Sequence, residues 1–465
     1  MMESRPRTGS IISFLVGRED LMVDLSIDFA GIRSPNPFWL ASAPPTNSSY
    51  QVCKAFEHGW GGAVWKTIGE PVMNVVNRYG AVDYNGQKIL GINNIELISD
   101  RSVDVNLKEI AETKRLWPDR AVIVSLMVES KRETWHDIVQ RTIDTGCDAI
   151  ELNYGCPHGM SERGMGAAVG QVPEYCTMIT EWVTEASTIP VLVKLTPNVA
   201  DIRYPGRAAK KGGADGISLI NTINTIMGVD LDTLELKPSI DGKGGHGGYA
   251  GPAVKPIALN MVSQLAVDSE IGLPISAMGG VSTWRDALEF ILLGATSIQV
   301  CTAVMHYGFR IIDDMMEGMT NWMEEKGYSN LNEVRGKSLK CITDFGSLNL
   351  LYKAVARIDE SKCIQCNLCT IACDDGAHQC IDVLPKPKEV NGSVLNLNQP
   401  QVREEDCVGC RLCFLVCPVD GCISMVRVDN GKETISWNEL MRQLPQPVTW
   451  EALRQFQHKH GIEIH

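Results

Sequence analysis

Two runs of cysteine with the same spacing constrain the fold of this 465-residue chain more than any other feature. Each run has the form C-x-x-C-x-x-C-x-x-x-C, and a proline follows the second. This spacing lets three thiolates hold one four-iron cluster while the fourth reaches the other cluster of a two-cluster domain. We therefore assign one 4Fe-4S cluster to Cys363, Cys366, Cys369 and Cys417. The second 4Fe-4S cluster is assigned to Cys373, Cys407, Cys410 and Cys413.

Other uses of these cysteines fit the sequence less well. Pairs spaced C-x-x-C also bind zinc, but two identical four-cysteine runs have little use for that spacing in a zinc site. Of the 16 cysteines, most lie between residues 363 and 422, and such clustering indicates metal rather than disulfides. We expect a reducing, cytoplasmic environment. Cys380 and Cys422, which follow the two runs at similar offsets, are expected to pack in the core.

The charge balance argues against two classes of partner. A formal net charge of -13 does not favour contact with nucleic acid or anionic lipid, because both require clustered lysine and arginine. No run of about 18 uncharged apolar residues could span a bilayer, so we expect neither nucleic acid nor a membrane as a partner. Residues 1–22 are read as an N-terminal extension, and a weak organelle-targeting role for them stays open.

Ahead of the cysteines, short apolar runs alternate with amphipathic stretches, which is the pattern of successive βα units. Eight such runs are found, at residues 37–42, 63–68, 121–127, 149–153, 191–195, 216–221, 274–278 and 297–301. Helical patterns follow most of them, for example at 134–144, 172–185, 256–264, 284–293 and 308–325. Eight strands with crossovers over about 300 residues predict a (β/α)8 TIM barrel rather than an open sheet.

The predicted fold class is therefore α/β, with a TIM barrel followed by a small α+β ferredoxin-like domain that holds both clusters. We expect the barrel to span residues 23–345 and the cluster domain to span residues 346–428. Residues 429–465 are expected to form a C-terminal tail, in which we read no chemistry.

Polar residues and glycines stand where the predicted strands end. They are Lys66-Thr67, Asn153, Lys194, Asn221-Thr222, Gly279-Gly280 and Cys301-Thr302. In a TIM barrel the active residues lie at these ends, and phosphate is often held after the last two strands. A buried lysine needs an anion or a hydrogen-bonding partner, which a flavin ring or its phosphate would supply. Because clusters pass single electrons, they also need a two-electron cofactor beside the substrate, and a flavin at this mouth meets that need.

Residues 149–171, AIELNYGCPHGMSERGMGAAVGQ, join a short apolar run to a glycine-rich loop that carries Cys156. Loops on a rigid scaffold often carry function, but nucleophilic, redox, metal-binding and structural roles for this thiol all remain open at this point. A literal G-x-G-x-x-G at residues 242–247 lacks a preceding strand and a following helix, so no nicotinamide site is inferred. We expect residues 242–251 to form a flexible loop that covers the barrel mouth.

Several motifs resemble the dihydropyrimidine dehydrogenase family, in its form that combines an FMN barrel with a two-cluster domain. They are NPFWLASAP, WKTIG, NNIELIS, ELNYGCPHGMSERGMG, VKLTPN, INTINTIMG, GGYAGPAVKPIAL and both cysteine runs, and the resemblance covers about residues 25–425. It implies that Cys156 is the general acid and base. It implies pyrimidine-binding roles for Asn94, Glu96, Ile98, Asn153, Asn221 and Thr222. It implies FMN contacts at Ala41, Ser42, Lys66, Thr67, Asn94, Lys194, Gly251, Gly279, Gly280, Cys301 and Thr302.

The reaction implied by the resemblance is reversible reduction of the 5,6 double bond of uracil or thymine, in which Cys156 protonates carbon 5. An unperturbed thiol pKa of about 8.5 suits a group that both gives and recovers a proton. Nothing in the sequence binds FAD or NAD(P)H, so a separate flavoprotein subunit should oxidise NAD(P)H and feed the clusters. The family also implies a hetero-oligomer with at least two copies of this chain. Gly155 departs from the many relatives that place serine before the cysteine.

Two rival functions stay open. A dihydroorotate dehydrogenase shares the FMN barrel, the paired lysines and the loop cysteine, although Glu96 should repel an orotate carboxylate by about 1 to 4 kcal/mol. The other rival is an electron-transfer subunit whose barrel has lost catalysis.

Overall fold

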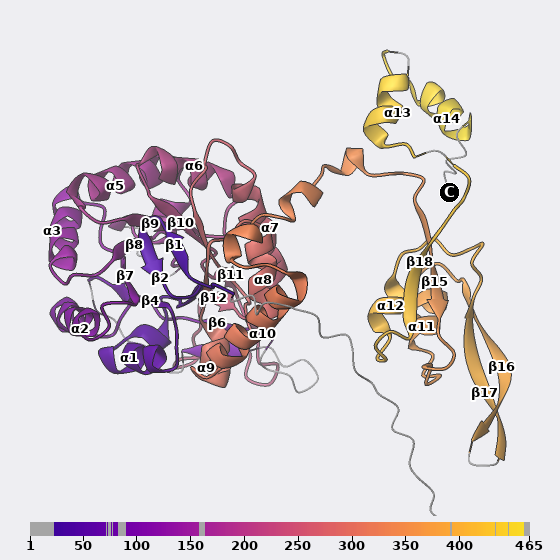
Figure 1. The fold of residues 1–465 in the computed structure, drawn as a ribbon, viewed down its shortest axis with the longest axis horizontal. Helices are drawn as coiled ribbons and strands as arrows, with labels where there is room; N and C mark the ends of the chain where they lie inside the picture. Colours follow the sequence, from indigo (N-terminus) through magenta and orange to yellow (C-terminus); the bar gives the residue numbers. More distant parts are fainter. Residues whose placement is uncertain are drawn as a thin grey trace, which may run out of the picture. The chain divides into compact units, whose positions relative to one another are not determined.

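The computed structural model describes residues 23–70, 72, 76, 78–81, 90–157, 163–390, 393–432, 434–444 and 446–459. For residues 386–390 and 393–397 only the backbone is described. The expected extension over residues 1–22 lies outside this part of the chain. The chain divides into two units, Met1–Cys341 and Ile342–His465 (Figure 1).

The first unit contains a closed barrel of parallel strands. Within the described residues eight strands take part, in the order β10-β13-β14-β3-β4-β7-β8-β9 around the barrel. Their bounds are β3 Phe38–Leu40, β4 Gly62–Ile68, β7 Ala121–Leu126, β8 Ala149–Asn153, β9 Val191–Lys194, β10 Gly216–Leu219, β13 Ile275–Met278 and β14 Ser297–Val300. Every predicted strand overlaps one of these, so the predicted TIM barrel is confirmed.

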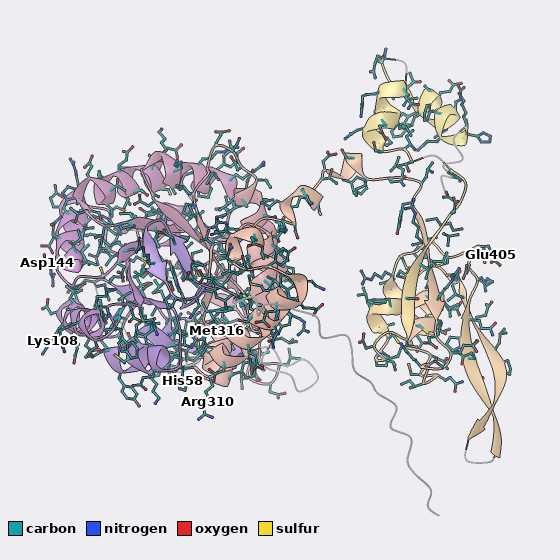
Figure 2. All side chains as sticks on the ribbon, in the orientation of Figure 1. His58, Lys108, Asp144, Arg310, Met316 and Glu405 are labelled. Atoms are coloured by element: carbon teal, nitrogen blue, oxygen red, sulfur yellow. The ribbon has the colours of Figure 1, made fainter. Side chains whose placement is uncertain are left out.

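Helices surround the barrel, as Figure 1 shows. They are α1 Ser49–Glu57, α2 Val103–Leu116, α3 Arg132–Ile143, α4 Ala167–Gly170, α5 Pro173–Ala186, α6 Arg203–Lys211, α7 Lys255–Ala266, α8 Trp284–Leu292, α9 Thr302–Tyr307 and α10 Ile311–Lys326. The five predicted helical patterns lie on α3, α5, α7, α8 and α10. Exposed charges such as Lys108 and Asp144 project from the outer side of this layer (Figure 2).

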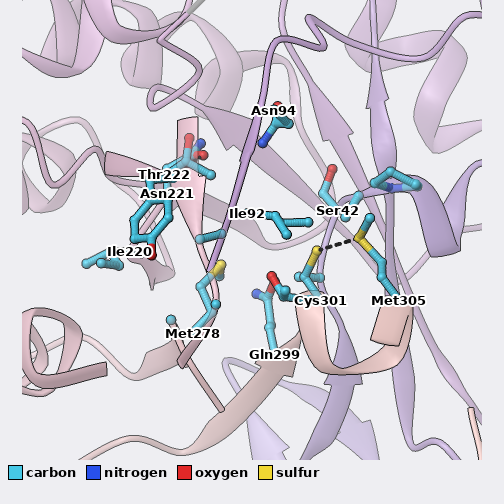
Figure 3. Close-up of a pocket in the computed structure, with 18 of the residues that line it drawn as sticks. Ser42, Ile92, Asn94, Ile220, Asn221, Thr222, Met278, Gln299, Cys301 and Met305 are labelled. Atoms are coloured by element: carbon cyan, nitrogen blue, oxygen red, sulfur yellow. Dashed lines mark hydrogen bonds between the residues drawn. The ribbon is translucent and has the colours of Figure 1, made fainter. Parts of the chain in front are cut away.

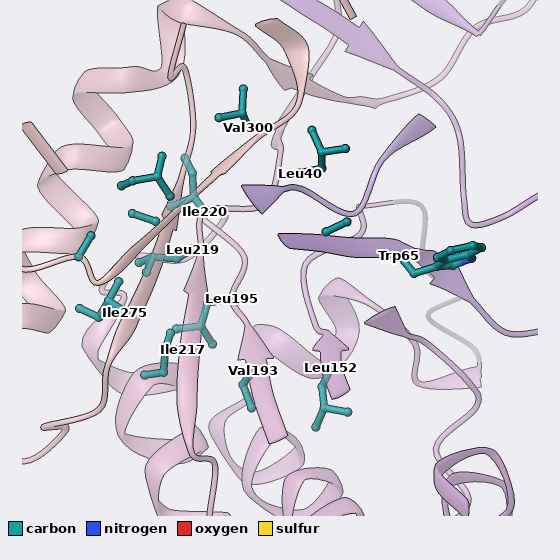
Figure 4. Close-up of a cluster of buried hydrophobic side chains, with 14 of the residues drawn as sticks. Leu40, Trp65, Leu152, Val193, Leu195, Ile217, Leu219, Ile220, Ile275 and Val300 are labelled. Carbon is teal, nitrogen blue, oxygen red and sulfur yellow. The ribbon is translucent and has the colours of Figure 1, made fainter. Parts of the chain in front are cut away.

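The strands are buried on both faces, which is why they read as continuous apolar runs in the sequence. Leu152, Val193, Ile217 and Leu219 belong to one large hydrophobic cluster with residues of the surrounding helices (Figure 4). Alternate positions on the same strands are polar, among them Glu151 on β8 and Ser218 on β10, and these are also fully buried. The strands therefore direct polar side chains into the barrel interior and pack apolar side chains against the surrounding helices.

A register shift in β4 explains why two adjacent polar residues face the same side. In a regular strand neighbouring side chains point to opposite faces. The pairing of β4 with β7 shifts between Trp65 and Ile68, which is the position of Lys66 and Thr67. A bulge of this kind re-aims side chains. Both Lys66 and Thr67 consequently line the barrel mouth.

Short strands outside the barrel complete the first unit. β1 Ile27–Phe29 pairs with β2 Ile32–Ser34, and a separate sheet has the order β11-β12-β6-β5. That sheet consists of β5 Tyr79–Ala81, β6 Ile92–Asn94, β11 Ile223–Thr225 and β12 Gly247–Ala250. The expectation of a flexible loop over residues 242–251 is therefore wrong for Gly247–Ala250, which pairs antiparallel with both β6 and β11.

The second unit holds two antiparallel strand pairs and short helices. β15 Lys353–Ile358 pairs with β18 Ile423–Val428, and β16 Ile381–Val390 pairs with β17 Ser393–Val402, both antiparallel. Two short helices, α11 Leu368–Thr370 and α12 Leu412–Val416, each lie within one cysteine run.

The stretch expected as a tail contains α13 Trp437–Gln443 and α14 Trp450–Lys459. Ser436 caps α13 by accepting a hydrogen bond from the backbone N–H of Glu439. These helices bury Leu440 and Leu453 in a small cluster of their own.

Candidate active site

A pocket opens at the carboxyl ends of the barrel strands. It contains about 1150 Å³ of empty space, part of which is open solvent. The structure brings to it all the residues that were expected to contact FMN or a pyrimidine. They are Ala41, Ser42, Lys66, Thr67, Asn94, Glu96, Ile98, Asn153, Cys156, Lys194, Asn221, Thr222, Gly251, Gly279, Gly280, Cys301 and Thr302. Figure 3 shows how Ser42, Asn94, Asn221, Thr222 and Cys301 surround this space.

The two lysines of the pocket are almost completely buried, at 6% exposure for Lys66 and 5% for Lys194. The ammonium of Lys66 lies 3.3 Å from a carboxylate oxygen of Glu96. The ammonium of Lys194 lies 3.8 Å from Oε1 of Glu151, which is too far for a hydrogen bond. No other described residue is found within hydrogen-bonding distance of the Lys194 ammonium. A ligand with an anionic or hydrogen-bond-accepting edge would complete its coordination.

Glu151 lies in the barrel interior with no exposed surface. Its Oε2 accepts a hydrogen bond of 3.2 Å from Nε2 of Gln299, and the same nitrogen contacts Oγ of Ser218 and Ser276. A buried carboxylate is costly without compensation. The ammonium of Lys194, 3.8 Å away, supplies the compensating positive charge. The Lys194 ammonium thus lies over a buried polar network in which Oε1 of Glu151 and Oε1 of Gln299 have no hydrogen-bond partner among the described residues.

Glu96 sits between two cations. Nη1 of Arg78 lies 2.6 Å from one of its oxygens, and Lys66 lies 3.3 Å from the other. The argument that Glu96 would repel an orotate carboxylate is weakened by this finding, since the two cations offset the negative charge of Glu96. Arg78 was not among the predicted site residues.

Hydrogen bonds join three polar residues that lie far apart in the sequence. Nδ2 of Asn221 donates to Oδ1 of Asn153 at 2.9 Å, and Nδ2 of Asn153 donates to the Thr67 hydroxyl at 2.9 Å. The Thr67 hydroxyl in turn contacts Oγ of Ser125 at 2.9 Å and Oγ of Ser42 at 3.2 Å. Residues in or just after five barrel strands, β3, β4, β7, β8 and β10, therefore form one connected set of hydrogen bonds.

Cys156 faces the pocket with 6% of its surface exposed. Its Sγ lies 3.5 Å from the carbonyl oxygen of Leu97, to which the thiol donates. Ile98, Met127 and Met165 pack around the same side chain. Residues 158–162 of its loop lie outside the described part of the chain. The thiol is thus held at the pocket by the segment that also carries Glu96.

A second thiol in the pocket has different properties. Burial raises the pKa of the Cys301 thiol to about 11, even though the nearby Lys194 ammonium favours the thiolate. Its Sγ lies 3.9 Å from the sulfur of Met305, as drawn in Figure 3. At neutral pH Cys301 therefore lines the pocket as an uncharged thiol.

The backbone after β13 turns at two glycines and packs closely against neighbouring segments. Gly279 and Gly280 both have positive φ, at 126° and 78°. A Cβ at Gly280 would lie 2.9 Å from the backbone nitrogen of Lys255 and 3.0 Å from the carbonyl oxygen of Gly251. These glycines allow the chain to turn sharply where it meets Gly251 and Lys255. The Lys194 ammonium, which has an ion-pair partner at 3.8 Å but no hydrogen-bond partner among the described residues, fits the electronegative edge of FMN.

Several lining residues were missed by sequence reasoning. Tyr79 comes from β5, Ile92 from β6 and Tyr249 from β12, and all three belong to the sheet that the sequence did not predict. Gln299 on β14 could have been found, because it stands two positions before Cys301 and shares its face of the strand.

The cysteines of the second unit lie around two small cavities. One is lined by Cys363, Cys366, Cys369 and Cys417, together with Cys422. The other is lined by Cys373, Cys407, Cys410 and Cys413, together with Cys380. Each cavity thus combines three cysteines of one run with the last cysteine of the other, which is the grouping that two 4Fe-4S clusters require.

A site for a single metal ion differs from these two cysteine-lined cavities, because its ligands must meet at one point. Among the described residues, no group of three or more His, Cys, Asp or Glu side chains converges on one metal ion.

Cys380 and Cys422 are buried, at 3% exposure each, in the same hydrophobic cluster as several proposed ligands. The expectation that they pack in the core is confirmed.

The sequence matches two family models. The model described as dihydroorotate dehydrogenase matches residues 25–323, and the model described as a 4Fe-4S dicluster domain matches residues 356–425. Fold and site define a barrel flavoenzyme of the class that binds FMN, joined to a domain with two 4Fe-4S clusters. Among the described helices, none is long and apolar enough to cross a membrane.

Individual relatives narrow the class. The NAD-dependent dihydropyrimidine dehydrogenase subunit PreA of Escherichia coli K12 is 39% identical over 411 residues, covering 88% of this chain and 97% of that protein. The chloroplastic dihydropyrimidine dehydrogenase (NADP(+)) of Arabidopsis thaliana is 41% identical over 69% of this chain and 78% of its own. The catalytic subunit of dihydroorotate dehydrogenase B from Pyrococcus abyssi is 37% identical over 68% of this chain and 99% of its own. This chain belongs to the dihydropyrimidine dehydrogenase family.

Proposed function

We propose that this protein reduces the 5,6 double bond of uracil or thymine, reversibly, with electrons that reach its FMN through two 4Fe-4S clusters. The observation that carries the proposal is the fixed orientation of the amides in the pocket. A backbone N–H can only donate a hydrogen bond and a backbone carbonyl can only accept one. Contacts with the backbone therefore distinguish the oxygen of each asparagine from its nitrogen.

Two asparagines offer N–H donors. Oδ1 of Asn153 accepts from the backbone N–H of Gly155 at 3.2 Å, and Oδ1 of Asn221 accepts from the N–H of Thr222 at 2.8 Å. Each Nδ2 uses one of its two hydrogens in the chain that ends at Thr67. One N–H of each amide is left over, with no partner among the described residues.

A third asparagine offers an acceptor. Nδ2 of Asn94 donates to the carbonyl oxygen of Gly248 at 3.2 Å, so its Oδ1 is the atom left for a ligand. The carboxylate of Glu96 is a second acceptor beside it. A uracil or thymine ring alternates two carbonyl oxygens with two N–H groups. The pocket offers both donors and acceptors, as such a ring requires.

Cys156 is proposed to protonate carbon 5 of the ring and to recover the proton in the reverse reaction. Its thiol has a donor proton, which the carbonyl of Leu97 accepts when no substrate is present. When bound, FMN supplies the hydride and the clusters supply single electrons. Lys194 would contact the polar edge of the flavin ring, and Gly279, Gly280 and Thr302 would border its phosphate. Apolar residues such as Ile92 and Met278 exclude water from the same space (Figure 3).

A partner subunit is proposed to deliver the electrons. PreA is named as a subunit, and we infer that this chain likewise works with a flavoprotein that binds FAD and oxidises NAD(P)H. Exposed Ile364 and Val408 border the two cysteine-lined cavities, and such apolar surface suits a protein partner. We further propose a hetero-oligomer with at least two copies of this chain, in the cytoplasm.

The test is product analysis with protein that retains FMN and iron. Incubation with uracil and a chemical electron donor should yield 5,6-dihydrouracil. If the protein holds FMN but converts only orotate, the proposal is wrong. If it holds iron and sulfide but binds no FMN, the electron-transfer function is correct instead.

Dihydroorotate dehydrogenase remains the second candidate because of one observation. Arg78 and Lys66 offset the charge of Glu96, so the pocket does not exclude a carboxylate by charge alone. Whether the pocket admits a carboxylate should be tested by adding orotate as a competitor of uracil.

A further inference from the structure

Gly155 precedes Cys156 and lies against Asn221. A Cβ placed on Gly155 would lie 2.4 Å from Cβ, 2.5 Å from Nδ2 and 2.7 Å from Cγ of Asn221. Packed atoms do not approach this closely, since contacts between carbon atoms are optimal at about 3.5 to 4.0 Å. The three nearest atoms all belong to one side chain. Gly155 is not among the residues with positive φ, so space rather than backbone conformation excludes a side chain there.

Gly155 and Asn221 also share a hydrogen-bond acceptor. The backbone N–H of Gly155 and Nδ2 of Asn221 both donate to Oδ1 of Asn153, at 3.2 Å and 2.9 Å. Asn153 ends β8, and Asn221 follows β10, which does not pair with β8 in the barrel. One carbonyl oxygen therefore joins the segment that carries Cys156 to a different part of the barrel mouth.

We propose that Gly155 is a positioning residue, which acts through Asn221. Because Gly155 has no side chain, the Asn221 amide can lie against the segment that carries Cys156. Hydrogen bonds with Asn153 and with the backbone N–H of Thr222 fix the orientation of that amide. In this chain, a side chain at position 155 displaces Asn221 from its present position, breaks its bond to Asn153 and removes a fixed N–H donor from the pyrimidine site. The inference rests on the proposed function, because it gives Asn221 a pyrimidine ring to contact.

The experiment is a double-mutant cycle in the holoprotein, with Gly155→Ala, Asn221→Gly and the two combined. Gly155→Ala should raise the KM for uracil about tenfold, the equivalent of one good hydrogen bond, while kcat changes less. Asn221→Gly removes all three clashing atoms, so adding Gly155→Ala to it should change KM less than about twofold. FMN and iron content should equal those of the unmodified protein in every variant.

The matched control is Gly245→Ala, because no atom lies within 4 Å of a Cβ at that exposed position. It should leave KM unchanged. Equal effects of Gly155→Ala on KM in both backgrounds would overturn the inference. If Gly155→Ala does not fold or loses FMN, the double variant should restore both, and failure to do so also overturns it.

A substrate-free measurement separates this inference from the proposed function. The thermal unfolding midpoint should fall with Gly155→Ala, and the fall should be much smaller in the Asn221→Gly background. No uracil turnover by the unmodified protein would contradict the proposed function, whereas equal falls in both backgrounds would contradict the contact between Gly155 and Asn221.

Discussion

Replacing Cys156 by alanine should abolish most pyrimidine reduction and leave the protein otherwise intact. General acid catalysis by a positioned side chain contributes about 10²- to 10⁴-fold, so the rate of uracil reduction should fall by that factor. The cost in stability should be small. The thiol donates a hydrogen bond of 3.5 Å to the carbonyl oxygen of Leu97 and packs against Ile98, Met127 and Met165, so its removal should cost about 1 kcal/mol.

The assay is a single turnover, in which the chemically reduced protein is mixed with uracil and flavin reoxidation is followed by absorbance. Cys147→Ala is the matched control, because Cys147 is an equally buried thiol that does not line the pocket. FMN and iron should be the same in both variants and in the unmodified protein. A fall of less than about tenfold in Cys156→Ala, with FMN fully bound, would remove the thiol from the proposed mechanism.

Three further predictions concern other parts of the site. Thr67→Val removes the hydroxyl that accepts from Asn153, so the KM for uracil should rise about tenfold without loss of iron, and an unchanged KM would contradict the role of this hydrogen-bond chain. Cys417→Ser should lower the iron content by about half, whereas Cys422→Ser should retain both clusters; iron analysis distinguishes them, and equal losses would refute the ligand assignment. Burial raises the pKa of Cys301 to about 11, so its thiol stays protonated at neutral pH. In protein freed of FMN, the rate of Cys301 alkylation, followed by mass spectrometry, should keep rising as the pH increases from 7 to about 11, and a flat profile over that range would be inconsistent with the burial.

The barrel could be predicted because its strands are buried on both faces and interrupted by amphipathic helices. Residues 149–153 were predicted as a strand and form β8 with the same bounds. Asn153 and Lys194 could be placed at the mouth because parallel strands all end on one side of a barrel.

Other features could not be predicted, for physical reasons. Gly247–Ala250 forms a strand although glycine is depleted in strands. Its pairing partners β6 and β11 are each only three residues long, and β6 also lies far away in the sequence. The contact of Arg78 with Glu96 arises in a stretch without clear periodicity. The Gly155 contact depends on where the Asn221 side chain lies, which no local pattern encodes.

Glu151 is an instructive intermediate case. It was read as part of an apolar strand, yet its carboxylate lies inside the barrel near Lys194. The twofold alternation of side chains places it on the same face as Asn153, so the sequence did hold a signal for its position. Its pairing with Lys194 required the structure, because the register of β8 against β9 is not encoded by either strand alone.

The most direct test of the central claim compares uracil with orotate as oxidants of the same reduced protein. FMN and iron are first quantified, the protein is reduced chemically, and each pyrimidine is added separately while the flavin absorbance is recorded. The proposed function predicts rapid reoxidation by uracil and little by orotate. Rapid reoxidation by orotate with none by uracil would contradict it.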